Sequence, residues 1–199
     1  MIALVDYKAG NLTSVKKALA TIGADVFVPE APGALREARG IIVPGVGHFG
    51  ATRALDAAWI EAILERIGEG RPLLGICLGM HWLFEGSDEA QDLAGLGLLS
   101  GQCRRLVSNE AIKIPHVGWN TLSLEREASI LEGVADHSQV YFTHSFVVPP
   151  TSETVATTEH GEPFTAVVQR ANIAGVQFHP EKSGEVGLRI LRNFVQLAG

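Results

Sequence analysis

The sequence predicts an α/β protein with a doubly wound, mostly parallel sheet, helices on both faces, and antiparallel strands added in the second half. In the first half, short apolar runs alternate with amphipathic segments, which is the pattern of βαβ units. In the second half, β-type segments follow one another, and a helical pattern closes the chain. No repeat or linker interrupts the 199 residues, so we expect one domain, residues 1–199.

The first half contains predicted strands that are continuously apolar, as strands buried on both faces are. They cover residues 2–6, 25–29, 40–44 and 72–76. Helices are predicted over residues 11–22, 51–67 and 79–85. In the first helix, Leu12, Val15 and Leu19 share one face, and Gly23 is a suitable stop signal.

From residue 96 onward the chain contains short β-type segments. They cover residues 98–106, 111–115, 121–124, 140–143, 153–158, 164–169 and 173–177. We expect them either to extend the main sheet as antiparallel strands or to form a second, small sheet. The final segment, residues 184–197, places Val186, Ile190 and Phe194 on one helical face.

Composition excludes several classes of protein. The chain carries 16 basic and 22 acidic residues, a net charge of −6, and no basic footprint typical of nucleic-acid binding. No apolar run approaches the ~18–20 residues that span a bilayer, and the N-terminus lacks the pattern of a signal peptide. Two cysteines, Cys77 and Cys103, cannot form a disulfide framework. We expect a soluble, cytoplasmic protein, and we predict no cofactor and no metal.

The strongest local signal is Gly-Ile-Cys-Leu-Gly at residues 75–79, between a predicted strand and a predicted helix. Glycines on either side allow the tight turn of a nucleophile elbow, since side chains there would clash with neighbouring backbone. The N-terminus of the following helix would favour a thiolate at Cys77. The alternative interpretation is a buried structural cysteine. Cys103 has no comparable setting.

A second signal is His-Pro-Glu at residues 179–181, directly after an apolar run. Residues two apart in an extended chain point to the same side. The Glu181 carboxylate can therefore hold one imidazole nitrogen of His179 while the other nitrogen faces a thiol. The alternative is a surface histidine and a solvated glutamate around Pro180.

A third signal is Pro-Gly-Val-Gly at residues 44–47, directly after a predicted strand. Such a turn can direct backbone N–H groups at an anion or an oxyanion, although it does not match a P-loop and a plain connection is equally consistent. In open α/β sheets, ligands bind beyond the carboxyl ends of the strands. We therefore expect the three motifs to converge at one edge of the sheet.

Together these motifs resemble those of the class I (triad) glutamine amidotransferases, over essentially the whole chain. Further segments are similar, more narrowly, to the HisH family, the glutaminase subunits of imidazole glycerol phosphate synthase in histidine biosynthesis. They are Val-Asp-Tyr-Lys-Ala-Gly-Asn-Leu at residues 5–12, Lys-Ile-Pro-His-Val-Gly-Trp-Asn at residues 113–120 and Tyr-Phe-Thr-His-Ser-Phe at residues 141–146.

The resemblance implies a glutaminase with Cys77 as nucleophile, His179 as base and Glu181 as the residue that orients the imidazole. The thiolate would attack the side-chain amide of glutamine, ammonia would leave, and water would hydrolyse the γ-glutamyl thioester to glutamate.

The resemblance also implies an oxyanion hole formed by the N–H of Leu78 and by an amide of the glycine turn, at Val46 or Gly47. The family is associated with a turn that must rearrange before this hole is complete, which would couple glutaminase activity to a ligand in the partner.

Other implied residues fall into two sets. The substrate-binding set is Gly45, His81, Glu89, Ser145 and Phe146. The partner-interface set is Asn11, Trp119, Asn120 and Lys182. For Trp119 a core position, and for Asn11 a helix cap, are the alternatives. His81 departs from the family, which usually has glutamine there. An imidazole lacks the paired donor and acceptor of an amide, so this departure bears on how substrate glutamine is bound.

The implied partner is a (β/α)8-barrel cyclase subunit of the HisF family, in a heterodimer. Ammonia would pass to it and react with the phosphoribosyl-formimino-carboxamide substrate PRFAR, which gives imidazole glycerol phosphate and AICAR. Two alternatives stay open: the glutaminase subunit of another synthase, such as the pyridoxal phosphate type, and a non-catalytic regulatory module on the same fold.

Overall fold

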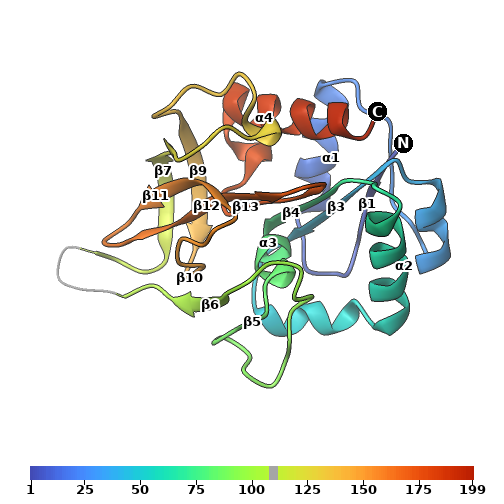
Figure 1. Ribbon diagram of the computed structural model, residues 1–199, viewed down its shortest axis with the longest axis horizontal. Helices are drawn as coiled ribbons and strands as arrows, with labels where there is room; N and C mark the ends of the chain where they lie inside the picture. Colours follow the sequence, from blue (N-terminus) through green and yellow to red (C-terminus); the bar gives the residue numbers. More distant parts are fainter. Residues whose placement is uncertain (108–111) are drawn as a thin grey trace.

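The computed structural model describes residues 1–107 and 112–199 and contains an eight-stranded main sheet (Figure 1). Its strand order is β2-β1-β3-β4-β13-β12-β11-β8. The first five strands in this order pair in parallel, and β12, β11 and β8 are added antiparallel. The strands, in sheet order, are β2 (Val26–Phe27), β1 (Ile2–Leu4), β3 (Gly40–Gly45), β4 (Leu73–Cys77), β13 (Ile173–Val176), β12 (Pro163–Arg170), β11 (Thr154–Glu159) and β8 (Ser123–Leu124).

Two small sheets and four α-helices complete the fold. One small sheet has the order β10-β6-β5, and the other pairs β7 with β9. Their strands are β5 (Gly86–Ser87), β6 (Gln102–Arg105), β7 (His116–Thr121), β9 (Gln139–His144) and β10 (Phe146–Val147). The α-helices are α1 (Leu12–Thr21), α2 (Ala57–Gly68), α3 (Leu78–Leu83) and α4 (Gly184–Leu197). Short 3-10 helices are η1 (Pro32–Glu37), η2 (Phe49–Ala54), η3 (Ser129–Leu131) and η4 (Pro180–Lys182). The prediction of a doubly wound, mostly parallel sheet with added antiparallel strands is confirmed.

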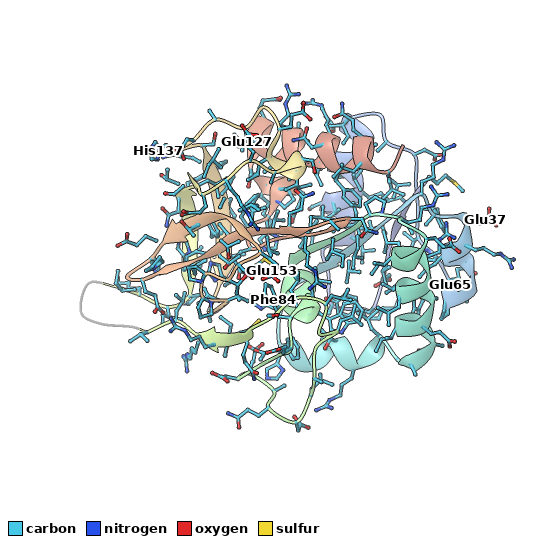
Figure 2. The ribbon with its side chains drawn as sticks, in the orientation of Figure 1. Glu37, Glu65, Phe84, Glu127, His137 and Glu153 are labelled. Atoms are coloured by element: carbon cyan, nitrogen blue, oxygen red, sulfur yellow. The ribbon has the colours of Figure 1, made fainter. Side chains whose placement is uncertain are left out.

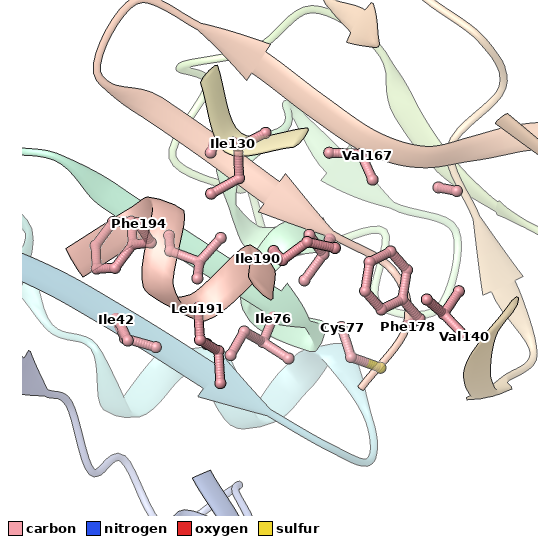
Figure 3. Close-up of a cluster of buried hydrophobic side chains, with 14 of the residues drawn as sticks. Ile42, Ile76, Cys77, Ile130, Val140, Val167, Phe178, Ile190, Leu191 and Phe194 are labelled. Atoms are coloured by element: carbon pink, nitrogen blue, oxygen red, sulfur yellow. The ribbon is translucent and has the colours of Figure 1, made fainter. Parts of the chain in front are cut away.

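Helices cover both faces of the sheet, and strand residues alternate between the two layers (Figure 1). Ile2 and Leu4 of β1 belong to the core cluster under α1 and α4, whereas Ala3 belongs to the cluster under α2 and α3. Figure 3 shows the first cluster, in which Phe178 and Cys77 lie at one end. The nucleophile candidate thus stands where the apolar core meets an edge of the sheet.

Charged side chains lie on the outside of the fold, among other exposed residues (Figure 2). Glu37, Glu65 and Glu127 are exposed and point outward, whereas Phe84 is fully buried. Within the described residues, every helix is too short or too polar to cross a membrane.

Several predicted elements are wrong in their bounds; the predicted strand at residues 98–106, for example, is confined to β6 at residues 102–105. The predicted helix at residues 51–67 is η2 followed by α2, because Asp56 ends the first and caps the second by accepting the N–H groups of Ala58 and Trp59 at 3.0 and 3.1 Å. The predicted strand at residues 111–115 is absent from residues 112–115, and residue 111 lies outside the described residues. Pro115 has no N–H for a ladder, so pairing starts only at His116.

The glycines on either side of Cys77 are required by close packing, as the sequence predicted. A Cβ atom at Gly79 would overlap the carbonyl oxygen of Val43 in β3. A Cβ atom at Gly75 would lie 2.6 Å from the carbonyl oxygen of Gly79. These neighbours are backbone atoms, so a side chain could be accommodated only by moving α3 away from the sheet.

We therefore expect Gly79→Ala to lower the free energy of unfolding by about 3 kcal/mol or more, through overpacking. Gly68→Ala is the matched control, because Gly68 ends α2 with open space around its Cβ position. The control should leave stability unchanged or raise it by up to ~1 kcal/mol, through helix propensity. Urea unfolding of both variants measures the difference; equal losses would contradict this account of the turn.

Candidate active site

Cys77 occupies a strained turn between β4 and α3. Its φ is +53° and its ψ is −108°, a conformation that costs a non-glycine residue about 1–3 kcal/mol. The residue is 6% exposed, and it directly precedes the first residue of α3. The turn directs the side chain beyond the carboxyl end of β4, as a nucleophile elbow does.

Three neighbouring parallel strands bring the three sequence motifs together. In the register of β3 and β4, Gly45 stands opposite Cys77, and in that of β13 and β4, Val176 stands opposite Ile76. The glycine turn, the thiol and the segment that leads to His179 therefore leave the sheet at one level. The expected convergence at one edge is confirmed.

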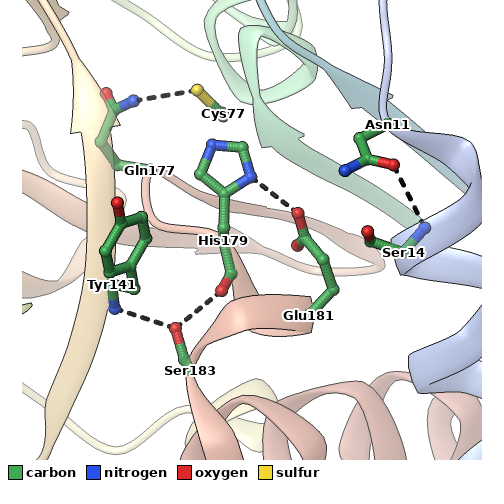
Figure 4. Close-up of polar contacts among 8 residues, drawn as sticks. All are labelled: Asn11, Ser14, Cys77, Tyr141, Gln177, His179, Glu181 and Ser183. Atoms are coloured by element: carbon green, nitrogen blue, oxygen red, sulfur yellow. Dashed lines mark hydrogen bonds and ion pairs between the residues drawn. The ribbon is translucent and has the colours of Figure 1, made fainter. Parts of the chain in front are cut away.

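His179 and Glu181 form a buried pair beside this thiol (Figure 4). His179 Nδ1 lies 2.8 Å from Glu181 Oε1, and the two side chains are 3% and 2% exposed. The other ring nitrogen, Nε2, faces Cys77 and makes no hydrogen bond within the described residues. Burial lowers the pKa of His179, but Cys77 and Glu181 raise it further, to about 9. An imidazolium is thus stabilised by the sulfur of Cys77 and the carboxylate of Glu181, which is the arrangement of a catalytic triad.

The His-Pro-Glu segment is anchored by Ser183, which sequence reasoning did not identify. Ser183 Oγ donates to the carbonyl oxygen of His179 at 2.7 Å and accepts the N–H of Tyr141 at 2.9 Å (Figure 4). The N–H of His179 in turn donates to the carbonyl oxygen of Tyr141 at 2.9 Å. These bonds join the segment to β9 and limit the movement of the imidazole. A serine four residues after a histidine carries no recognisable signal by itself.

The proposed oxyanion turn is closed in this structure. The N–H of Val46 donates to the carbonyl oxygen of Ala9 at 2.6 Å, so it is not available to a ligand. Gly47, the other candidate donor, has a φ of +94° and lines the cavity described below. Leu78 is the first residue of α3, where a backbone N–H has no partner within its helix.

A cavity of about 330 Å³ opens beside Cys77, within the usual size range of small-molecule sites. Most of the predicted site residues line it: Val46, Gly47, Cys77, Leu78, His81, Glu89, Ser145 and Phe146. The remaining lining residues are Pro115, Thr143 and His144. Gly45, predicted to bind substrate, is not among the lining residues, because it is buried and paired in the sheet opposite Cys77.

Several cavity residues already have partners in the fold. Glu89 Oε2 accepts the N–H of Phe49 at 2.6 Å, which leaves its other oxygen for a ligand. The carbonyl oxygen of Ser145 accepts the N–H of Leu106 at 2.9 Å. His81 Nε2 lies 2.7 Å from Gln177 Oε1, and Gln177 Nε2 lies 3.8 Å from Cys77 Sγ. Gln177 was not identified from the sequence.

The predicted interface residues do not form one cluster. Trp119 is 55% exposed and packs edge-on against the ring of Tyr141, over which Lys182 Nζ lies at 5.7 Å. Asn120 is engaged internally, donating to the carbonyl oxygen of Glu159 at 2.9 Å. Asn11 caps α1 by accepting the N–H of Ser14 at 3.3 Å. The helix cap is therefore present at Asn11, and a core position for Trp119 is excluded.

Comparison with known proteins agrees with this arrangement. The family model "Glutamine amidotransferase class-I" matches residues 3–197. Proteins named "Imidazole glycerol phosphate synthase subunit HisH" are similar along their length. That of Moorella thermoacetica is 44% identical, covering 98% of this chain and 94% of its own. That of Gloeobacter violaceus is 46% identical, covering 99% of this chain and 89% of its own. That of Methanothermobacter thermautotrophicus is 42% identical, covering 99% of this chain and 98% of its own.

Solved structures share the fold. One described as a glutamine amidotransferase has a TM-score of 0.78 at 21% identity, covering 100% of both chains. The PurLQS structure from Thermotoga maritima has a TM-score of 0.76 at 19% identity, covering 98% of this chain and 97% of that one. At these identities the likeness concerns the fold alone.

We expect Glu181→Gln to lower the pKa of His179 from about 9 toward the ordinary value near 6.5, because the carboxylate that stabilises the imidazolium is lost. A pKa raised by folding contributes stability fully below about pH 6.5 and loses it as the pH rises through about 9. NMR titration of the His179 ring measures the pKa, with exposed His137 as internal control. An unchanged His179 titration would contradict the role of Glu181.

Proposed function

Since the chain belongs to the class I glutamine amidotransferases, and within them to the HisH family, we propose that it releases ammonia from glutamine as the glutaminase subunit of an imidazole glycerol phosphate synthase. The observation that carries this proposal is the buried Cys77, His179 and Glu181 set beside a cavity of suitable size. A non-catalytic module would have no need for a strained nucleophile turn aimed at such a pair.

The proposed reaction begins when the Cys77 thiol gives its proton to His179 Nε2. The thiolate attacks the side-chain carbonyl carbon of glutamine, and the imidazolium, held by Glu181 at Nδ1, gives the proton to the departing nitrogen. Ammonia leaves and a γ-glutamyl thioester remains. His179 then takes a proton from water, which attacks the thioester, and glutamate and free Cys77 result. The raised pKa of His179 favours the protonated state that the departing nitrogen requires.

We assign oxyanion binding to the N–H of Leu78 and to an amide of the glycine turn, at Val46 or Gly47. The Val46 N–H must leave the carbonyl oxygen of Ala9 before it can serve. One oxyanion donor is worth roughly 100- to 1,000-fold in rate. The closed turn therefore supports a subunit that is slow on its own and is activated by a change in this loop.

We assign substrate recognition to the walls of the cavity. The free oxygen of Glu89 would bind the α-ammonium group, and the Ser145–Phe146 backbone would bind the amino-acid end of glutamine. His81 reaches the same cavity, whereas Gly45 would contribute by leaving room for the turn rather than by contact.

We further propose a partner that supplies the acceptor chemistry: a (β/α)8-barrel cyclase subunit of the HisF family, in a cytoplasmic heterodimer. It would use the ammonia to convert PRFAR to imidazole glycerol phosphate and AICAR. Trp119 and Val117, 55% and 56% exposed on β7, form with Lys182 the best-supported contact surface, because large exposed apolar side chains near a site mark protein interfaces.

Replacing Cys77 by alanine should abolish glutamate release, because no other described side chain occupies the turn at the cavity. Cys103→Ser is the matched control, because Cys103 is fully buried outside the cavity, where its Sγ lies 3.8 Å from the backbone carbonyl oxygen of His81. Glutamate formation is measured with the cyclase subunit present, and complex formation by gel filtration. Release of glutamate by Cys77→Ala would overturn the assignment of the nucleophile.

Trp119→Ala should weaken binding of the cyclase by about 2 kcal/mol, the usual loss at a central aromatic contact. Leu64→Ala is the control, because Leu64 is also an exposed apolar side chain, at 40%, but lies on α2. Calorimetric titration with the cyclase gives the affinity. Glutamine hydrolysis with cyclase alone, and with cyclase plus its ligand, tests the coupling. Equal losses of affinity in Trp119→Ala and Leu64→Ala would argue against this surface. An absence of stimulation of glutamine hydrolysis by the cyclase and its ligand would favour a regulatory module.

A further inference from the structure

A short relay of buried side chains, separate from the His179–Glu181 pair, reaches Cys77. Gln177 Nε2 lies 3.8 Å from Cys77 Sγ, and Gln177 Oε1 lies 2.7 Å from His81 Nε2. Gln177 is 0% exposed and His81 is 4% exposed. Figure 4 shows the Gln177 amide directed at the Cys77 sulfur, with the imidazole of His179 also close to this sulfur. The triad mechanism assigns no role to Gln177.

The chemistry of the groups determines the direction of both hydrogen bonds. An amide oxygen only accepts, so His81 must carry its hydrogen on Nε2 and donate to Gln177 Oε1. The amide nitrogen of Gln177 then points its hydrogens at Sγ, which accepts. Neutral His81 can donate this hydrogen bond. Burial favours the neutral imidazole by lowering the pKa of His81, and this effect exceeds the raising effect of the hydrogen bond with Gln177.

We propose that Gln177 is a further catalytic residue, whose amide N–H stabilises the Cys77 thiolate, and that His81 is a positioning residue that holds this amide in the donating orientation. Without His81 the amide could rotate and turn its oxygen toward the sulfur, where a negative charge would be repelled. The inference rests on the proposed function, because it takes Cys77 as the nucleophile. A hydrogen bond to a charged group is stronger than one to a neutral group.

The amide would act at two points of the reaction without exchanging its own proton. It would stabilise the thiolate after the proton moves from Sγ to His179 Nε2. It would do so again when the sulfur leaves the γ-glutamyl carbon during hydrolysis of the thioester, as the C–S bond breaks and the electron pair returns to Sγ. In the thioester the sulfur is uncharged, so the hydrogen bond from Gln177 is weakest in that intermediate. The stronger hydrogen bond to the thiolate therefore favours release of the acyl group.

The remaining titratable groups around the relay are the same in all the variants considered. His179 and Tyr7 interact electrostatically with Cys77, from the segment after β13 and the loop after β1. His144 on β9 interacts with His81, and Glu89 lines the same cavity. Cys103 Sγ lies 3.8 Å from the carbonyl oxygen of His81, and a serine replaces Cys103 in every variant compared. A change in Cys77 reactivity on altering Gln177 or His81 therefore reports the relay.

The test is the rate at which iodoacetamide alkylates Cys77, measured from pH 5 to pH 10 in a Cys103→Ser background. Gln177→Met removes the N–H donor at nearly unchanged side-chain length. It should move the midpoint of the pH profile up by roughly one unit. At neutral pH it should lower kcat for glutamine about tenfold with little change in KM.

The His81 variants give a second test that does not depend on the folding of Gln177→Met. His81→Leu removes the donor and should shift the alkylation profile in the same direction as Gln177→Met. His81→Gln restores an N–H at this position and should return the profile toward that of the parent protein. The double variant with His81→Leu and Gln177→Met should shift no further than Gln177→Met alone, because both changes break one relay.

Each outcome is decisive for the proposal. An unchanged alkylation profile in Gln177→Met, or a shift in His81→Leu with none in Gln177→Met, would overturn it. A raised KM with an unchanged profile would overturn it too and show that these side chains bind glutamine directly. Cys77→Ala assayed in parallel separates the two proposals: glutamate release by that variant would overturn the assignment of Cys77 as nucleophile, whereas loss of glutamate release alongside unshifted profiles would overturn only the relay.

Discussion

The parallel pairing of β4 between β3 and β13 is the constraint on which the site depends. Because the three strands run in the same direction and are paired residue by residue, their carboxyl ends meet at one level. Each end carries one part of the chemistry: the glycine turn after β3, Cys77 after β4, and His179 with Glu181 after β13. The strands are buried on both faces, so this alignment is held by two apolar layers rather than by the polar groups of the site.

This support makes the strain at Cys77 tolerable. The turn costs about 1–3 kcal/mol in backbone strain. Burial of a single large apolar side chain such as Ile76 or Leu78 stabilises by a comparable amount, roughly 1.5–3 kcal/mol. The absence of side chains at Gly75 and Gly79 lets α3 approach β3 and β4 closely enough for its first turn to face the thiol. The apolar core and the reactive turn are therefore parts of one packing arrangement.

The electrostatics of the site follow from its position at the end of the core. Burial alone disfavours charge on His179, and the polar and charged groups of Cys77 and Glu181 reverse that effect. Anchoring by Ser183 keeps the imidazole between these neighbours, and the amide nitrogen of Gln177 lies 3.8 Å from the same sulfur. The glycine turn after β3 is not arranged as an oxyanion hole, because the Val46 N–H donates to the carbonyl oxygen of Ala9. Under the proposed function, activation would require movement of this one turn and would leave Cys77, His179 and Glu181 in place.

Local features of the chain determined much of this protein. The flanking glycines required a tight turn at Cys77, the two-residue spacing placed Glu181 beside His179, and the apolar runs defined the parallel strands. Each depends only on neighbouring residues. Local signals failed where a competing one was overlooked, as at Asp56, which caps α2, and at Pro115, which delays β7. Tertiary structure alone decided that β13 joins β4 and that Gln177 reaches a sulfur 100 positions away. It also decided that the glycine turn is closed on Ala9. Such contacts depend on how whole layers pack, and no short stretch of sequence specifies that.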